Sequence, residues 1–316
     1  MAAYKYVFGP VASSRLGLSL GLDCIGPTKT CTLDCVYCEV GPTRRLTLKR
    51  DDYAPPADIL AEIERWKSES RRTPDYITLG GRGEPCLNSG LAAIIRGSRK
   101  IFPSVPVAVL TNATLLGDPD VRRDLALADV VLPSMDSLLQ NEFQAVNRPH
   151  PRLKLDSIAE SLNEFRREYD GKIFLEILLV SGLNDTDGNL EKLEKYVREL
   201  SPDRVDVVTM TRPGTEREAS PVDEPVLARW RKTLLAEQTL RKSSPMRTKE
   251  IFQTDDPERI REMVLSSITR RPQTAEDLAR ALAVAEKDVE KVLADLAAKG
   301  EAVASKDKGK TFYGTF

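Results

Sequence analysis

Three cysteines near the N-terminus constrain this chain more than any other feature of its sequence. Cys31, Cys35 and Cys38 have the spacing C-x3-C-x2-C on one short segment, and thiolates this close together can hold a metal centre. A structural zinc site needs a fourth Cys or His ligand nearby, but the single histidine, His150, lies far downstream. Three ligands to a four-iron cluster leave one iron open to bind a small molecule. The missing ligand favours an open [4Fe-4S] cluster, with zinc or an unrelated cluster as the alternative.

Composition limits the compartment and the partners of the chain. Its 316 residues allow one large core or two domains, and its formal net charge of -1 gives no overall sign of a nucleic-acid or membrane partner. The N-terminus has no apolar signal core, and no later run is long enough to span a bilayer. Five cysteines, three of them in one cluster, suit a reducing cytosol better than a disulfide framework. We therefore expect a cytoplasmic protein that does not contact a membrane.

Short apolar runs alternate with helical patterns along most of the chain. The expected strands cover 16–25, 75–81, 105–112, 129–134, 172–180 and 204–211. The expected helices cover 58–70, 91–100, 119–128, 155–169, 190–200 and 227–240. Such alternation indicates an α/β fold of parallel strands joined by right-handed crossovers. In a parallel barrel the chemistry lies at the C-terminal ends of the strands.

The cysteine segment resembles the cluster loop of the radical S-adenosylmethionine (SAM) enzymes, with aromatic Tyr37 directly before the last cysteine. The chain resembles an uncharacterised group of iron-sulfur oxidoreductases in that superfamily. It contains the motifs of this group in the same order: Phe-Gly-Pro, Cys-Val-Tyr-Cys-Glu, Gly-Glu-Pro, Leu-Thr-Asn and Asn-Arg-Pro. More distantly, the chain is similar to the tRNA-modifying wybutosine-synthesis enzymes. The resemblance implies a partial (β/α)6 TIM-like barrel over 1–240, with one [4Fe-4S] cluster on the three cysteines.

The resemblance also implies the first chemical step. SAM would bind the open iron, and an electron from a donor such as flavodoxin or ferredoxin would cleave it to a 5′-deoxyadenosyl radical. That radical takes a hydrogen atom from a substrate that the sequence does not identify.

A glycine-rich segment follows the second expected strand. Gly81 and Gly83 allow the backbone to approach a ligand closely, and the segment resembles the family's Gly-Gly-Glu motif. By this resemblance Glu84 and the glycines meet the amino group of SAM. A tight strand-to-helix turn is the alternative.

Polar residues at the ends of later strands complete the expected SAM site. The resemblance places Asn112 there, together with Ser134 and Asp136, which would hold the ribose and carboxylate of SAM. Turn capping is an equal alternative for Ser134 and Asp136. Glu176 lies within an apolar strand and, pointing into a barrel, would face the cofactor, while Thr211 lies at the mouth.

Two further cysteines, Cys24 and Cys86, are too few to hold a second four-iron cluster, so we predict one cluster. Cys86 directly follows Glu84-Pro85, and as a catalytic thiol it would donate a hydrogen atom to a product radical. The alternative is packing, the usual role of a free cysteine. Arg212 is a candidate clamp for an anionic substrate, with a surface role as the alternative.

The last segment predicts a second domain. After a linker at 241–256, residues 257–316 predict three helices and a two-stranded wing, which resembles a winged helix-turn-helix. A capping box is expected at Thr274 to Asp277. The third helix mixes acidic and basic side chains, whereas a DNA reader needs a basic face, so docking of a protein or peptide substrate is favoured over nucleic acid. Radical modification of tRNA and a redox-sensing, DNA-binding regulator are the alternative functions.

Overall fold

The computed structural model describes residues 4–13, 15–70, 73–235, 257–269, 272–282, 284–307 and 309–315. Its largest sheet has seven strands in the order β1-β2-β5-β6-β7-β8-β9. These strands are β1 (Val7–Ser13), β2 (Gly17–Asp23), β5 (Tyr76–Gly80), β6 (Val107–Thr111), β7 (Val130–Pro133), β8 (Lys172–Leu179) and β9 (Arg204–Thr209). Neighbours from β2 to β9 are parallel, and β1 is antiparallel to β2. The six parallel strands are those that the hydrophobic pattern predicts.

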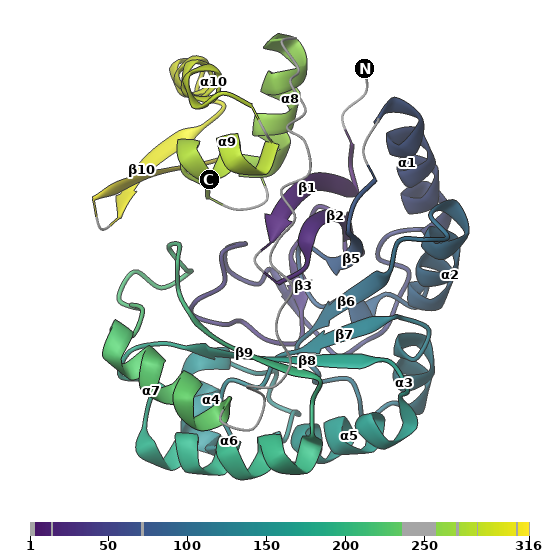
Figure 1. The fold of residues 1–316 in the computed structure, drawn as a ribbon, viewed down its shortest axis with the longest axis vertical. Coiled ribbons are helices and arrows are strands. Elements are labelled where there is room, and N and C mark those ends of the chain that lie inside the picture. The colour runs from purple at the N-terminus through teal and green to yellow at the C-terminus, as the bar shows by residue number, and fades with distance from the viewer. Residues whose placement is uncertain are drawn as a thin grey trace.

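Helices connect the parallel strands and lie along the outside of the sheet (Figure 1). They are α1 (Pro56–Glu69), α2 (Leu91–Ile101), α3 (Pro119–Leu125), α4 (Gln140–Asn147), α5 (Leu155–Glu168), α6 (Asp187–Leu200) and α7 (Glu224–Leu234). In α2 the buried residues are Leu91, Ile94, Ile95 and Ser98, a spacing that places them on one face of a helix. Packing of such faces against the sheet forms the main core.

The two faces of the sheet pack differently. Along β8, Ile173 and Ile177 are buried in the core between sheet and helices. Phe174 and Glu176, which alternate with them, point to the opposite face, where Phe174 packs against a small apolar cluster made of Leu16, Ala108, Val130 and Leu132. This second face is the concave interior of a partial barrel.

Strand β1 and helix α4 are among the elements that the sequence pattern does not predict. Strand β1 contains Gly9 and Pro10, residue types that are depleted in strands. Helix α4 buries the polar residues Glu142 and Asn147 beside Phe143 and Val146, so its apolar stripe is weak. In both cases tertiary packing, not local propensity, decides the structure.

Residues after 256 form three helices and an antiparallel hairpin: α8 (Pro257–Ile268), α9 (Ala275–Leu282), α10 (Glu286–Ala298), β10 (Val303–Asp307) and β11 (Lys310–Gly314). They have a core of their own. The predicted cap is present, because Asp277 N donates to Thr274 Oγ1 at 3.1 Å. The elements match the expected order, whereas the winged-helix assignment and the domain boundaries stay predictions. The predicted linker at 241–256 lies outside the described residues.

The C-terminal helices lie against the barrel near its open edge. Helices α8 and α9 pack beside β1 (Figure 1). Arg82 Nη2 donates to the Thr269 carbonyl at 3.3 Å, and Arg212 Nη2 lies 3.6 Å from a carboxylate oxygen of Asp277. Both arginines follow the C-terminal ends of barrel strands, so these helices border the mouth of the barrel. Within the described ranges, no helix has an apolar stretch long enough to cross a bilayer.

Candidate active site

The three cysteines lie on the long connection between β2 and α1. Cys31 ends the short strand β3 (Thr30–Cys31), which pairs in parallel with β4 (Arg45–Leu46). Cys35 and Cys38 lie on the turn that follows, where Cys38 N donates to the Cys35 carbonyl at 3.2 Å. All three cysteines are free and, as whole residues, half-buried.

Each cysteine sulfur accepts a hydrogen bond from a side chain of a different segment. The donors are Lys29 Nζ to Cys38 at 2.9 Å, Asn112 Nδ2 to Cys31 at 3.5 Å and Asn147 Nδ2 to Cys35 at 3.4 Å. Hydrogen bonds to ligand sulfurs stabilise their negative charge and adjust the reduction potential of an iron-sulfur cluster. The surroundings therefore suit thiolates that hold iron.

The donor set fits a four-iron cluster better than a single metal ion. Within the described ranges, no three His, Cys, Asp or Glu side chains converge as one metal ion requires. In a [4Fe-4S] cluster each cysteine binds a separate iron, so the sulfurs stand apart on one loop. Burial raises the pKa of Cys31 to about 12 and also raises the pKa of Cys35. Bound iron would supply the positive charge that favours both thiolates.

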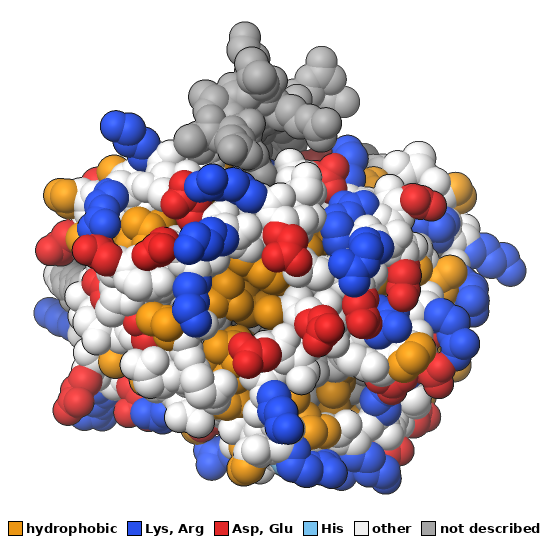
Figure 2. Space-filling model, turned by 90° about the horizontal axis from the view of Figure 1, so that it is seen from below, with side chains coloured by type: hydrophobic (Ala, Val, Ile, Leu, Met, Phe, Trp, Pro, Cys, Tyr) orange, Lys and Arg blue, Asp and Glu red, His pale blue; other side chains and the backbone are white. Residues whose placement is uncertain are grey.

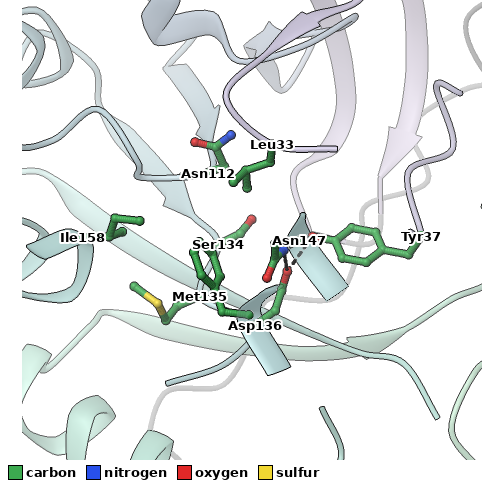
Figure 3. Close-up of a pocket in the computed structure, with 9 residues that line it drawn as sticks. Leu33, Tyr37, Asn112, Ser134, Met135, Asp136, Asn147 and Ile158 are labelled. Carbon is green, nitrogen blue, oxygen red and sulfur yellow. Dashed lines mark hydrogen bonds between the residues drawn. The ribbon is translucent and has the colours of Figure 1, made fainter. Parts of the chain in front are cut away.

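A small pocket, part of it open to solvent, lies between the cysteine loop and the strand ends. Its lining is mostly apolar with a few polar groups, as in small-molecule sites; the lining residues are Leu33, Tyr37, Asn112, Ser134, Met135, Asp136, Phe143, Asn147 and Ile158 (Figure 3). Four of the predicted site residues, from three separate segments, thus meet here: Tyr37, Asn112, Ser134 and Asp136.

Asp136 joins three segments at this pocket. Its Oδ2 accepts hydrogen bonds from the Tyr37 hydroxyl at 2.6 Å and Asn147 Nδ2 at 2.7 Å (Figure 3), and its Oδ1 accepts one from Leu178 N at 3.0 Å. Burial raises the pKa of this carboxyl, and the three donors oppose that rise. Burial also raises the pKa of the Tyr37 hydroxyl, so the tyrosine stays a hydrogen-bond donor. The cysteine loop is thereby fixed to the end of β7.

Asn147 has an unused acceptor at the pocket. Its Nδ2 donates to Asp136, which fixes the orientation of the amide, and its Oδ1 is buried without a partner among the described residues. A buried carbonyl oxygen without a donor is costly. A ligand with an N–H or O–H group, such as the amino or hydroxyl groups of SAM, would satisfy it.

The glycine-rich segment packs closely against its own chain, and its predicted approach to SAM stays a prediction. Gly81 has φ +108° and Gly83 has φ +148°, conformations that side chains rarely adopt. A Cβ atom on Gly83 would overlap the carbonyl of Thr30, the residue before Cys31. This backbone therefore lies directly against the cysteine loop.

The Glu84 carboxylate is engaged by its own chain. Its Oε1 accepts from Cys86 N at 3.0 Å and Thr111 Oγ1 at 2.7 Å, and its Oε2 accepts from Asn112 N at 2.7 Å. Burial raises the pKa of Glu84 despite these donors. The residue joins the ends of β5 and β6 and positions Asn112. Since Oε2 keeps a free lone pair, direct contact with the SAM amino group stays a prediction.

Besides Gly81, Gly83 and Glu84, three further predicted site residues do not line the pocket. Cys86 is buried, with its thiol 3.5 Å from Thr111 Oγ1. Glu176 points to the barrel interior as expected, but its carboxylate pairs with Arg15. Thr211 is exposed after β9. Their roles in the reaction stay predictions.

Arg212 lies beside the cysteine loop. Its Nη1 is 3.3 Å from Glu39, the residue after Cys38, while its Nη2 faces Asp277. The arginine thus already has acidic partners on both sides, which favours an internal link over the clamp for an anionic substrate.

A family model described as the Radical SAM superfamily matches residues 25–196. The chain belongs to the radical SAM superfamily. Membership of this superfamily implies that its cofactors are a [4Fe-4S] cluster and SAM and that it is a radical SAM superfamily enzyme. A UPF0026 protein of Synechocystis, slr1464, is 36% identical over 66% of this chain and 76% of its own length. A radical SAM methyltransferase of Sphaerobacter thermophilus shares the fold, with a TM-score of 0.52 and 20% identity over 69% of this chain and 63% of that one.

Two other relatives are informative in different ways. A protein of Brachyspira hyodysenteriae called GTPase Obg is 31% identical over 94% of this chain. The matched region spans 43% of that relative's length, so its name applies to the longer protein. A probable dual-specificity RNA methyltransferase RlmN of Cytophaga hutchinsonii is 25% identical over 58% of this chain and 51% of its own length.

Two site residues carry no role in the sequence-based prediction. Asn147 stands in the Asn-Arg-Pro-His segment, but only the fold shows that its side chain contacts both Cys35 and Asp136. Lys29, two residues before Cys31, bonds Cys38. Its position beside the first cysteine was a usable signal, because a buried lysine needs an anionic or carbonyl partner.

Proposed function

We propose that the protein uses the cluster on Cys31, Cys35 and Cys38 to cleave SAM and abstract a hydrogen atom from a substrate bound in the barrel. When bound, the cluster and SAM supply a 5′-deoxyadenosyl radical. The observation that carries the proposal is the direct link between the cysteine loop and the pocket: Tyr37, between two cluster ligands, donates to Asp136 at the end of β7. The Asp136 carboxylate thus holds the cysteine loop against the end of β7.

The residues of the chain have distinct tasks in this proposal. Asn112 and Asn147 donate to cysteine sulfurs and also line the pocket, so they couple the cluster to the ligand. Asn147 Oδ1 accepts a ligand hydrogen bond, and Gly81 and Gly83 bring the backbone close to the cysteine loop. The apolar lining around Leu33 and Phe143 excludes water from a reactive intermediate.

The test is product formation under anaerobic conditions. Protein reconstituted with iron and sulfide is reduced with dithionite and mixed with SAM, and 5′-deoxyadenosine is measured by chromatography. Wild type is expected to produce it, and Cys35→Ala is expected to bind less iron and produce none. A wild type that holds a cluster but leaves SAM intact would contradict the proposal and direct attention to the sensor alternative.

A substrate docked by the C-terminal helices is the first candidate for substrate class. The contacts made by Arg82 and Arg212 hold these helices at the mouth of the barrel. A large substrate that enters the mouth would contact them. The exposed side of α10 carries both signs of charge, including Glu286, Lys287 and Glu290, which suits a protein or peptide better than a polyanion.

Radical modification of tRNA is the second candidate. The distant similarity to the RNA methyltransferase RlmN favours it, as does the basic tip of the hairpin near Lys306 and Lys310. Gel-shift measurements with bulk tRNA separate the two candidates: salt-sensitive binding supports tRNA, and no shift leaves the protein or peptide candidate.

A further inference from the structure

Lys29 is the one lysine or arginine among the described residues that is buried, with 6% of its surface accessible. The other buried charged side chains of the described ranges are all acids: Asp23, Glu84, Asp136 and Glu142. On the face of the molecule shown in Figure 2, by contrast, lysines and arginines are spread over the surface among acidic side chains. Burial of an ammonium group is costly unless anionic or carbonyl acceptors surround it, so the partners of Lys29 indicate the role of its charge.

Two acceptors on the cysteine loop bind the Lys29 ammonium. Nζ donates to Cys38 Sγ at 2.9 Å and to the Gly41 carbonyl. At the backbone of the same residue, the Lys29 carbonyl accepts from Arg44 N and Arg45 N, each at 3.1 Å. Backbone and side chain are therefore both fixed, which holds the ammonium beside the sulfur of Cys38.

The donor to Cys38 differs in charge from the donors to the other two cysteines. Cys31 accepts from the neutral amide of Asn112 at 3.5 Å. Cys35 accepts from the neutral amide of Asn147 at 3.4 Å. Cys38 accepts from a cation at a shorter distance, and a hydrogen bond from an ionised donor is about twice as strong as one between neutral groups. The positive charge beside the cysteines is thus concentrated at Cys38.

We propose that Lys29 sets the reduction potential of the cluster, acting through the ligand Cys38. This inference rests on the proposed function, because it requires a cluster on the three cysteines. A [4Fe-4S] cluster held by three thiolates is an anion, and reduction adds one electron without transfer of an atom. A fixed cation at a ligand sulfur favours the more negative, reduced state. Lys29 therefore makes the cluster easier to reduce than neutral donors alone would.

The same contacts allow a second role, in which Lys29 only holds the cysteine loop together. That structural role needs an intact loop and a bound cluster, but it does not need a positive charge. Charge and structure can be separated, because substitutions of Lys29 can keep or remove the cation. Salt gives a further distinction, since a buried charge is screened much less than an exposed one.

The experiment is a redox titration of the reconstituted protein without SAM, monitored by electron paramagnetic resonance. In Lys29→Met, a neutral variant, the equilibrium constant for one-electron reduction is expected to fall at least tenfold, a shift of about 59 mV to lower potential. Lys29→Arg keeps the cation and is expected to stay close to wild type. Added salt should leave the shift in Lys29→Met nearly unchanged. Iron and sulfide content show that each variant holds the same cluster.

Three further variants complete the comparison. Asn112→Ala removes a neutral donor to Cys31 and should lower the potential less than Lys29→Met does. Lys49→Met is the matched control, because this lysine is exposed and paired with Asp51, and it is expected to match wild type. Lys29→Gln is the second neutral variant, measured in case Lys29→Met takes up less iron.

An unchanged potential in the neutral variants of Lys29 would overturn the proposal, and weaker SAM binding in the same variants would then assign the ammonium to SAM. An equal shift in Lys29→Arg and Lys29→Met would also overturn it, as would loss of the cluster from both neutral variants, since either result assigns Lys29 to the structure of the loop.

Failure of the proposed function has a separate signature. The potential would depend on Lys29 as expected, yet wild type would produce no 5′-deoxyadenosine from SAM. A wild type that takes up no cluster would refute both.

Discussion

Two buried carboxylates stand at the ends of barrel strands, Glu84 after β5 and Asp136 after β7, and we predict that they serve different purposes. Each accepts three hydrogen bonds, and burial raises the pKa of each. The donors to Glu84 come from the strand ends and loops of the barrel itself. Those to Asp136 include Tyr37 of the cysteine loop, and Asp136 alone lines the pocket. Similar burial and similar bonding thus support a structural role in one case and a site role in the other.

Replacing Glu84 by Ala should have the largest effect on stability. It removes three acceptor contacts and leaves the buried N–H groups of Cys86 and Asn112 without partners, so the free energy of unfolding should fall by about 3 kcal/mol. Urea denaturation of the metal-free protein measures this. Glu84→Gln is the control, because it keeps the size and one acceptor oxygen and should lose less. A loss under about 0.5 kcal/mol for Glu84→Ala would show that the contacts reorganise easily.

Asp136→Asn should chiefly affect the ligand. The amide has one acceptor oxygen, so either Leu178 N or the donors Tyr37 and Asn147 then face an NH2 group. We expect SAM affinity to fall about tenfold, with a stability loss of about 1–2 kcal/mol. Calorimetric titration of the reconstituted protein with SAM measures this affinity, and Glu84→Gln is the variant for comparison. An equal loss of SAM affinity in Glu84→Gln would show that Glu84 and Asp136 do not differ in their role. It would support the predicted contact between Glu84 and the SAM amino group.

Tyr37→Phe isolates the bond between the cysteine loop and Asp136. It should cost about 1 kcal/mol of stability, because Asp136 keeps two other donors. Iron content after reconstitution should stay near that of wild type, since the three cysteines are unchanged. Faster exchange of amide hydrogens in the cysteine loop would show that the loop has lost its attachment, and unchanged exchange would argue against this linking role.

The pH dependence of stability should be the smallest effect. Both carboxyls bind their protons more tightly in the folded chain, because burial raises their pKa. Their contribution is therefore fully present below the unfolded pKa, about 4, and is lost as the pH rises through the folded pKa. Urea unfolding of the metal-free protein from about pH 4 to 7 should show a shallower decline for the double variant Glu84→Gln/Asp136→Asn. An identical slope would show that the carboxyls do not govern this pH range.

The sequence predicted six parallel strands from its hydrophobic pattern, and the resemblance of its cysteine loop to that of the radical SAM enzymes predicted the cofactors. Apolar side chains recur with one fixed spacing in strands and another in helices, so short stretches of sequence are enough to tell the two apart. This pattern predicts β2, β5, β6, β7, β8 and β9 within a few residues. The spacing of Cys31, Cys35 and Cys38 is also local. The ends of parallel strands lie at one edge of the sheet by geometry, and the resemblance assigned Asn112, Ser134 and Asp136 at these ends to the SAM site.

Only the tertiary structure decided which polar side chains bind each other and which face the pocket. Glu84 and Cys86 follow the same motif in sequence yet are buried beside β6, away from the pocket, because Thr111 and Asn112 supply partners from another strand. Asn147 and Lys29 gained roles through contacts with sulfur atoms up to 112 residues away. Such hydrogen bonds depend on how distant segments pack, and the periodic pattern of the sequence does not predict them.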